Sequence, residues 1–125
     1  PNDGKFQFVN YIYYENQWMQ NGLGPVQFVI EKINPLTVGR IKANLLVPTP
    51  EIVVNDFHTD MPSPEKFTTA IFYINDNDGY TEFEDGTIIE SVANRMVIFP
   101  SHMKHRGTSA TTDRRVLINF NYISK

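Results

Sequence analysis

Hydrophobic and polar residues alternate with a period of two along most of the chain, which is the pattern that β-strands produce. In some stretches the alternation is strict, so that apolar and polar side chains would face opposite sides of a sheet. In others, β-branched and aromatic residues form almost continuous runs, as in strands that are buried on both faces. The predicted strands are residues 6–8, 26–31, 41–47, 51–57, 67–74, 95–100 and 115–123.

Clusters of Pro, Gly, Asn and Asp separate these strands and predict turns. They occupy residues 47–50, 75–79 and 84–86. Helical periodicity is weak, and the best candidates for helices are residues 15–20 and 29–34. Many short strands at near-regular spacing favour a barrel or a two-sheet sandwich. We therefore expect an all-β or mainly β fold with little helix.

The chain has 125 residues, of which 41% are hydrophobic and 20% are charged. This size and composition are typical of one globular domain with a substantial core, so we expect a single domain over residues 1–125. Because the first residue is Pro1 and not methionine, we expect this domain to be trimmed at its N-terminus.

The charge balance and the cysteine count narrow the classes of function. The formal net charge is −3, which disfavours binding to nucleic acid through its phosphates. The chain contains no cysteine, which excludes disulfides and thiolate metal sites and is in keeping with a reducing compartment. No apolar run is long enough to span a membrane. We therefore expect a cytoplasmic protein that binds neither a membrane nor nucleic acid.

A candidate metal site begins at His58 and Asp60. Residues two apart in an extended segment point to the same side, so both side chains can reach one ion. A second histidine would complete a set of two imidazoles and one carboxylate, which is the facial triad of Fe(II) enzymes. We favour His105 over His102, because His105 starts a late strand after a turn and is followed closely by glycine. His102 is expected to be a solvated loop residue.

Arg115 and Tyr73 are the candidate residues for binding a carboxylate. On the strand at 115–123, Arg115 shares one face with Leu117, Asn119 and Asn121. An arginine that points into a barrel requires an anion, and a guanidinium matches a carboxylate well. The alternative is that Arg115 is exposed and Arg114 points inward. Tyr73 could donate to the same carboxylate, or it could be a core tyrosine with a local partner.

With these residues in order, the chain resembles the 2-oxoglutarate/Fe(II)-dependent oxygenases of the prolyl-4-hydroxylase-like branch. It is similar in particular to the small oxygenases that are common in bacteriophage genomes. The resemblance covers residues 40–122. It rests on five motifs in the same order, HTD, TTAIFYIN, GYTEFEDG, RMVIFPSHMKHRG and RRVLINFNY.

The resemblance implies a double-stranded β-helix, which is a jelly-roll or cupin-like barrel. It implies that His58, Asp60 and His105 are the catalytic Fe(II) ligands, and that Arg115 and Tyr73 bind the far carboxylate of 2-oxoglutarate. The implied activity is hydroxylation of a C–H bond with O2, releasing succinate and CO2, with ascorbate as a candidate reductant. A prolyl or peptidyl substrate is favoured by the resemblance alone, and a phage-encoded protein would act in the host cytoplasm.

Two other functions stay open. A cupin-like metal-binding barrel without oxygenase activity would give Arg115 and Tyr73 no role. A nucleobase-modifying oxygenase would require stacking aromatic residues beside the iron, for which Tyr80 and Phe83 are candidates. The aromatic residues between Phe6 and Trp18 could line a substrate groove, or they could simply cover one face of the barrel.

Overall fold

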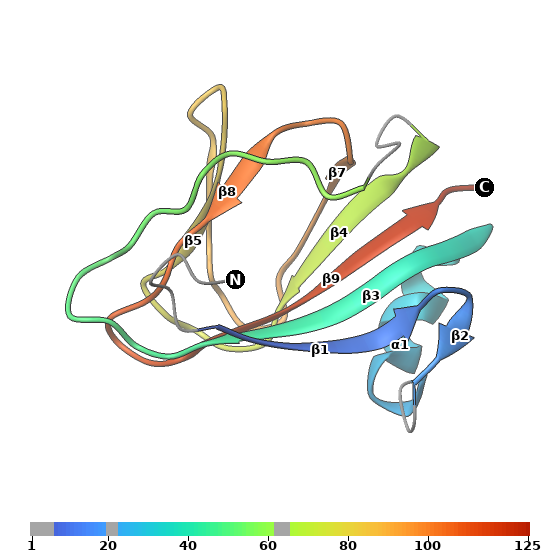
Figure 1. The fold of residues 1–125 in the computed structure, drawn as a ribbon, viewed down its shortest axis with the longest axis horizontal. Helices are drawn as coiled ribbons and strands as arrows, with labels where there is room; N and C mark the ends of the chain where they lie inside the picture. The colour runs from blue at the N-terminus through green and yellow to red at the C-terminus, as the bar shows by residue number, and fades with distance from the viewer. Residues whose placement is uncertain (1–6, 20–22, 62–65) are drawn as a thin grey trace.

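The strands of this chain form two antiparallel sheets that face each other. A computed structural model describes residues 7–19, 23–61 and 66–125. The elements are β1 (Gln7–Tyr14), β2 (Gln17–Trp18), α1 (Leu23–Ile33), β3 (Thr37–Leu46), β4 (Thr68–Tyr73), β5 (Tyr80–Phe83), β6 (Ile88–Glu90), β7 (Met96–Pro100), β8 (His105–Gly107) and β9 (Arg115–Ile123). A six-stranded sheet has the order β2-β1-β3-β9-β4-β7, and a three-stranded sheet has the order β6-β5-β8 (Figure 1).

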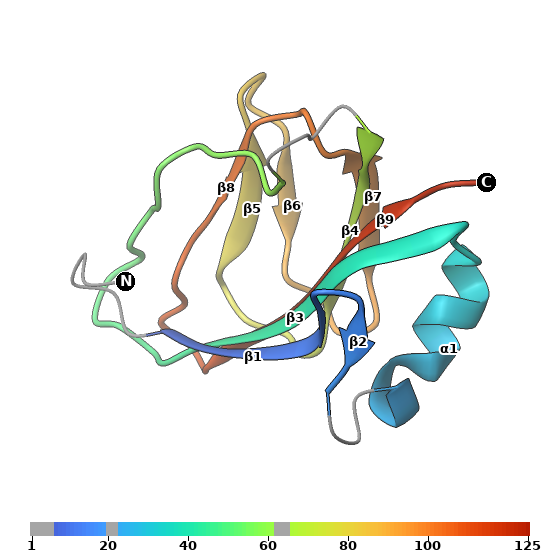
Figure 2. The ribbon, with the colours of Figure 1, turned by 45° about the vertical axis from the view of Figure 1, so that its right-hand side comes forward.

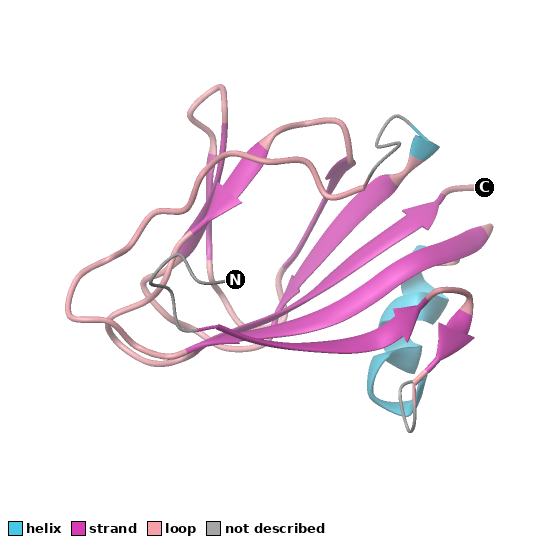
Figure 3. Ribbon diagram, viewed as in Figure 1, coloured by secondary structure: helices cyan, strands magenta, loops and turns pink. Residues whose placement is uncertain are grey.

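The mainly β character that the alternation predicts is confirmed (Figure 3). Strands β3, β4, β7 and β9 lie where the apolar runs predicted them. Strand β9 also has the predicted faces, because Phe120 and Tyr122 pack in one hydrophobic cluster and Leu117 packs in another. The first cluster lies between the large sheet and α1, on the outer face of that sheet (Figure 2). The second cluster lies on the inner face, and two of its residues, Ile71 and Leu117, line the cavity.

Of the two helix predictions near the N-terminus, the one at residues 15–20 is wrong, and the one at residues 29–34 is confirmed as part of a longer helix. The described part of the predicted helix at 15–20, residues 15–19, is not helical, because Glu15 and Asn16 have positive φ angles of 51° and 65° and make the two-residue turn between β1 and β2. Residues 29–34 overlap the helix α1, which also contains the predicted strand 26–31. Val26 and Val29 are three residues apart, so in a helix both face the sheet. Over so short a segment, apolar residues can fit a helical spacing and a strand alternation at the same time, and the alternation led to the wrong prediction. Asn34, with φ 46°, ends the helix.

The predicted strand at 51–57 is also wrong. The chain here runs beside β8 and the residue after it, and makes two isolated bridges, one between Val54 and Thr108 and one between His58 and His105. It does not form a continuous ladder with that strand. The bridges nevertheless fix the backbone at the point where the candidate metal ligands lie.

No helix in the described ranges has the length and apolar character that crossing a bilayer requires.

Candidate metal centre

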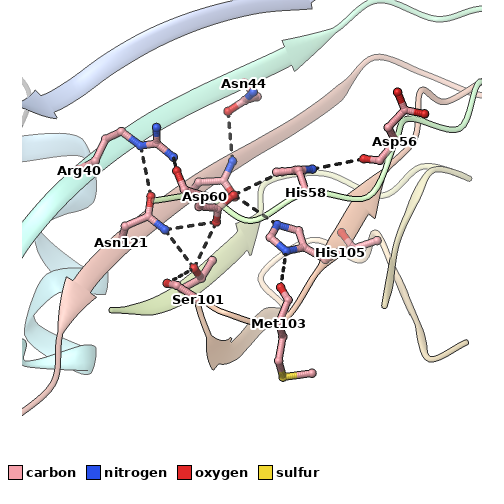
Figure 4. A network of polar contacts seen from close by, with 12 residues as sticks. Arg40, Asn44, Asp56, His58, Asp60, Ser101, Met103, His105 and Asn121 are labelled. Carbon is pink, nitrogen blue, oxygen red and sulfur yellow. Dashed lines mark hydrogen bonds and ion pairs between the residues drawn. The ribbon is translucent and has the colours of Figure 1, made fainter. Parts of the chain in front are cut away.

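Three side chains converge between the two sheets. Nε2 of His58 lies 3.3 Å from Oδ1 of Asp60, and Nε2 of His105 lies 3.4 Å from the same oxygen. One ligand atom from each residue lies within 4.8 Å of the other two (Figure 4). Two imidazoles and one carboxylate in this arrangement can occupy one face of a divalent first-row metal ion.

The backbone brings the two histidines together. The amide of His58 donates to the carbonyl of His105 at 2.9 Å, and the amide of His105 donates back at 3.0 Å. This antiparallel bridge places the ring centroids 4.6 Å apart. His102 lies exposed in the turn before β8 and is outside the cluster. The structure therefore groups His58 and Asp60 with the histidine that starts a strand.

Hydrogen bonds leave both Nε2 atoms available to a metal. Nδ1 of His58 is 3.3 Å from the carbonyl of Asp56, and Nδ1 of His105 is 3.1 Å from the carbonyl of Met103. A carbonyl oxygen only accepts, so each Nδ1 carries the hydrogen. In a neutral imidazole Nε2 then keeps its lone pair, which is the form that binds metals.

The other oxygen of Asp60 is held by the large sheet. Oδ2 accepts from Oγ1 of Thr69 at 3.1 Å and from Nδ2 of Asn121 at 3.2 Å. Arg40 donates to Oδ1 of Asn121 and to the backbone carbonyl of Asp60, which fixes the orientation of the Asn121 amide. Ser101 completes the group through the hydroxyl of Thr69. Oδ1 of Asp60 is thus left to face the histidines.

Sequence reasoning did not assign Thr69, Ser101 or Arg40 to the site. Alternation along β9 did place Asn121 on the inward face, but nothing in the sequence joins it to Asp60, which lies 61 positions away. Hydrogen-bond partners of metal ligands have no motif of their own, so this group could be found only from the fold.

Contacts within the cluster change the pKa values of the Asp60 and His58 side chains. Burial raises the pKa of the Asp60 carboxyl, but hydrogen bonds that the imidazoles of His105 and His58 donate when Nε2 carries a proton outweigh burial and hold this pKa below its usual range. The hydrogen bond to Asp60 raises the pKa of His58. Asp60 is therefore ionised at neutral pH, as a ligand must be.

Arg115 is buried at the other end of the inner face. Only 3% of it is exposed, whereas Arg114 is exposed, so the inward direction predicted for Arg115 is confirmed. Its Nε donates to Ser91 Oγ at 3.2 Å and its Nη2 donates to Thr81 Oγ1 at 3.2 Å. No carboxylate among the described residues pairs with it. Burial accordingly lowers the pKa of Arg115 to about 10.

Two glycines make room for this guanidinium. A Cβ at Gly79 would lie 2.6 Å from Cδ of Arg115 and 2.8 Å from the carbonyl of Ser109. A Cβ at Gly107 would lie 3.2 Å from Nη1 of Arg115. The arginine is therefore seated in a space that only glycine leaves open at position 79.

Tyr73 is fully buried, and its hydroxyl donates to Thr81 Oγ1 at 2.8 Å. It does not line the cavity, whereas Thr81 does. Burial raises the pKa of Tyr73, so its hydroxyl keeps its proton. Thr81 thus accepts from both Tyr73 and Arg115, which leaves the threonine hydroxyl hydrogen free for another acceptor. The sequence did not indicate Thr81 or Ser91 as members of the site.

The cavity that joins these groups has a volume of about 340 Å³. It is lined by Gln7, Lys42, Asn44, Leu46, Asn55, Asp56, His58, Asp60, Ile71, Thr81, His105, Gly107, Arg115, Leu117 and Asn119. Its wall on the large sheet carries a chain of amides. Asn119 donates to Asn44 at 3.2 Å, and Asn44 donates to Gln7 at 3.0 Å.

Tyr80 and Phe83, the aromatic residues considered for stacking on a nucleobase, do not line the cavity. Phe83 is buried against Phe99 and His105, so it offers no face for stacking. None of the aromatic residues described between residues 7 and 18 lines the cavity. Tyr13 packs against the outer hydrophobic cluster. Phe6 falls outside the described residues.

No family model matches the sequence, and no curated protein matches it. Solved structures of cupin domains are similar to it in fold. A cupin domain of an XRE family transcriptional regulator from Enterobacter cloacae has a TM-score of 0.58 at 8% identity, covering 95% of this chain and 98% of that one.

Two further cupins agree with this likeness. A cupin domain from Bordetella pertussis Tohama I has a TM-score of 0.58 at 8% identity, covering 97% of this chain and 96% of that one. A cupin superfamily protein from Desulfitobacterium hafniense has a TM-score of 0.56 at 11% identity, covering 94% and 78%. The predicted jelly-roll barrel is confirmed: the chain has the cupin-type fold, with a His–Asp–His cluster inside it.

Proposed function

We propose that this chain is an Fe(II)- and 2-oxoglutarate-dependent oxygenase that hydroxylates a C–H bond. The observation that carries the proposal is the buried charge of Arg115. A buried cation without a counter-ion is costly, and within the described residues this one has only two hydroxyl partners. A bound carboxylate would offset that cost, and the cavity links Arg115 to the metal cluster.

The residues fit a divalent ion. His58, Asp60 and His105 would hold it through Nε2, Oδ1 and Nε2, and their other polar atoms are already engaged. Three protein ligands on one face leave coordination positions open for other molecules, which is the arrangement of non-haem Fe(II) oxygenases.

The residues also fit a dicarboxylate. Nη1 of Arg115 faces Gly107, and Gly107 lies two residues after His105 on β8. Two residues of a strand span roughly 6.8 Å, which a five-carbon dicarboxylate can bridge between the metal and the guanidinium. Arg115 would bind the far carboxylate, Thr81 would donate its free hydroxyl hydrogen to it, and Tyr73 would orient Thr81.

When bound, the iron, 2-oxoglutarate and O2 supply the oxidising chemistry, with release of succinate and CO2. The chain would position these ligands and exclude water from the cavity. Leu117 and Ile71 pack beside the cavity, and the amides of Asn119 and Asn44 form its polar wall. The prolyl or peptidyl substrate that the resemblance favours remains part of this proposal.

The test is ligand-dependent stabilisation followed by turnover. In the presence of Mn(II), 2-oxoglutarate is expected to raise the Tm, because a ligand that binds only the folded state stabilises it. Its dimethyl ester, which lacks both charges, serves as the control. The Fe(II)-loaded protein is then assayed for succinate against a panel of peptides, amino acids and nucleic acids. Equal effects of the acid and the ester would contradict the proposal.

A second candidate is a metal-binding cupin barrel without oxygenase activity. The structural likeness to cupin domains favours it, since that likeness includes a domain of a transcriptional regulator. It predicts that the same three residues bind a metal ion, and that no ligand requires Arg115 for its binding.

A further inference from the structure

Lys42 is a second cation on the cavity wall, and its surroundings differ from those of Arg115. It lies on β3, paired in register with Asn119 of β9 and Tyr11 of β1. Its side chain lines the cavity. Among the described residues its ammonium has no ion-pair or hydrogen-bond partner.

This lysine lies beside the metal cluster on the open side of the cavity. It lines the same cavity as the metal-binding candidates His58 and Asp60. The side chain of His58 is 52% exposed and Tyr11 is 38% exposed. A molecule entering from solvent therefore meets Lys42 before it reaches Arg115, which is buried.

The proposed ligands leave the charge of Lys42 uncompensated. A divalent ion and Arg115 together balance Asp60 and a dicarboxylate. The remaining carboxylate on the lining is Asp56, whose backbone carbonyl holds His58 and whose own side chain points away from the cluster (Figure 4). An open cation near a reaction centre favours an anionic ligand.

The rest of the wall indicates a small and polar ligand. The amide chain of Asn119, Asn44 and Gln7 runs along the wall on which Lys42 lies. The cavity, about 340 Å³, is near the lower end of the range for ligand pockets, and the co-substrate would fill part of it.

We infer that Lys42 binds a carboxylate of the primary substrate, which is a small polar molecule or a chain-terminal residue. This inference rests on the proposed function and names the substrate class of the same site. Lys42 would hold the carboxylate at the open side of the metal, while Arg115 holds the co-substrate on the buried side.

The experiment compares matched acids and amides as probes. N-acetylglycine is compared with N-acetylglycinamide, and N-acetyl-L-proline with N-acetyl-L-prolinamide. The protein is loaded with Mn(II) and with an inert analogue of 2-oxoglutarate that carries NH in place of the methylene beside the keto group. Relaxation of probe protons by Mn(II) reports binding next to the metal, and saturation transfer from protein to probe reports binding without any metal.

Wild-type protein is expected to bind each acid about five- to tenfold more tightly than its amide, as for one partly screened charge pair. Lys42→Met should abolish this preference, and Lys42→Arg should keep most of it. Lys104→Met is the matched control, because it removes one charge from an exposed position outside the cavity. The Tm of each variant checks folding.

Two results would overturn the inference. One is an equal affinity of wild type for acid and amide. The other is a loss of 2-oxoglutarate binding in Lys42→Met as large as in Arg115→Met, which would assign Lys42 to the co-substrate. Failure of the proposed function looks different, because 2-oxoglutarate would then not bind wild type at all. Saturation transfer can still measure the preference for acid over amide probes in Arg115→Met. A preference that persists in this variant would support the role of Lys42 in binding the carboxylate.

Discussion

Asn121 donates its side-chain amide to Oδ2 of Asp60 at 3.2 Å, from a strand at the centre of the large sheet. This hydrogen bond, with that from Thr69, leaves a single carboxylate oxygen facing the histidines. The metal cluster is therefore anchored in the core of the barrel as well as in the loop that carries Asp60.

Asn121→Ala is expected to lower metal affinity about 10- to 100-fold, as when hydrogen-bond partners of metal ligands are removed. Isothermal titration with Mn(II) or Zn(II) measures it. Asn119→Ala is the control, because Asn119 lines the same wall without touching Asp60. Similar affinities in the two variants would show that Asn121 does not act through the carboxylate.

His58→Ala and His105→Ala are each expected to abolish stoichiometric metal binding, because two protein ligands remain. His58 lies at the open side, so its variant should keep a native far-UV spectrum. His102→Ala should bind one ion per chain, since His102 is exposed and outside the cluster. The metal content of each variant after dialysis tests these expectations. An unchanged content in His105→Ala would assign the third metal ligand to His102.

Metal affinity is expected to fall as the pH decreases from about 8 to about 5, because protons compete for the imidazoles. The hydrogen bond to Asp60 raises the pKa of His58. In the metal-free protein that contact therefore stabilises the fold fully below the unfolded pKa of histidine, and its contribution is lost as the pH rises through the folded pKa. The difference in Tm between metal-loaded and metal-free protein should shrink toward acid pH, and a constant difference would contradict this account.

Arg115→Ala is expected to weaken 2-oxoglutarate binding by about 2–5 kcal/mol, the range for one partner of a buried charge pair, with metal affinity unchanged. Tyr73→Phe should cost less, about 0.5–1.5 kcal/mol, because its hydroxyl acts through Thr81. Arg114→Ala is the matched control on the neighbouring exposed position. Titration calorimetry on Mn(II)-loaded protein ranks the three, and a larger loss in Arg114→Ala would contradict the assigned role of Arg115.

Asp78 is expected to make folding stability depend on pH in acid. Hydrogen bonds from the side chain and amide of Thr111, with others from Thr112, lower the pKa of Asp78 to about 2. Its stabilisation is fully present above the unfolded pKa of about 3.9 and is lost as the pH falls through about 2. Asp78→Asn should lower the urea midpoint at pH 7, and its difference from wild type should shrink as the pH falls through about 2. Glu84→Gln, an exposed control, should leave the midpoint unchanged at both pH values.

The sequence predicted those parts of the molecule that depend on local periodicity. The faces of β9 followed from alternation, and with them the inward direction of Arg115. The turn at Glu15 and Asn16 could not be predicted, because its positive φ angles occur without glycine. The helix α1 was obscured because its apolar spacing fits both periods over a short window.

Some residues of the candidate site could be predicted from the sequence, and others could be found only from the structure. His58, Asp60 and His105 carry a recognisable order and spacing, and the structure groups them. Thr69 and Thr81 are ordinary strand residues and Ser91 directly follows β6, and the partners of all three lie far along the chain. Their roles follow from strand register, which depends on how the whole sheet pairs, so no local pattern indicates them.

The amide chain on the cavity wall gives that wall a direction. Asn44 accepts from Asn119 through Oδ1 and donates to Gln7 through Nδ2. Turning the Asn44 amide over would set two donors against each other on one side and two acceptors on the other. The three amides must therefore turn together or not at all, so the hydrogen bonds along this wall all run in one direction at a time.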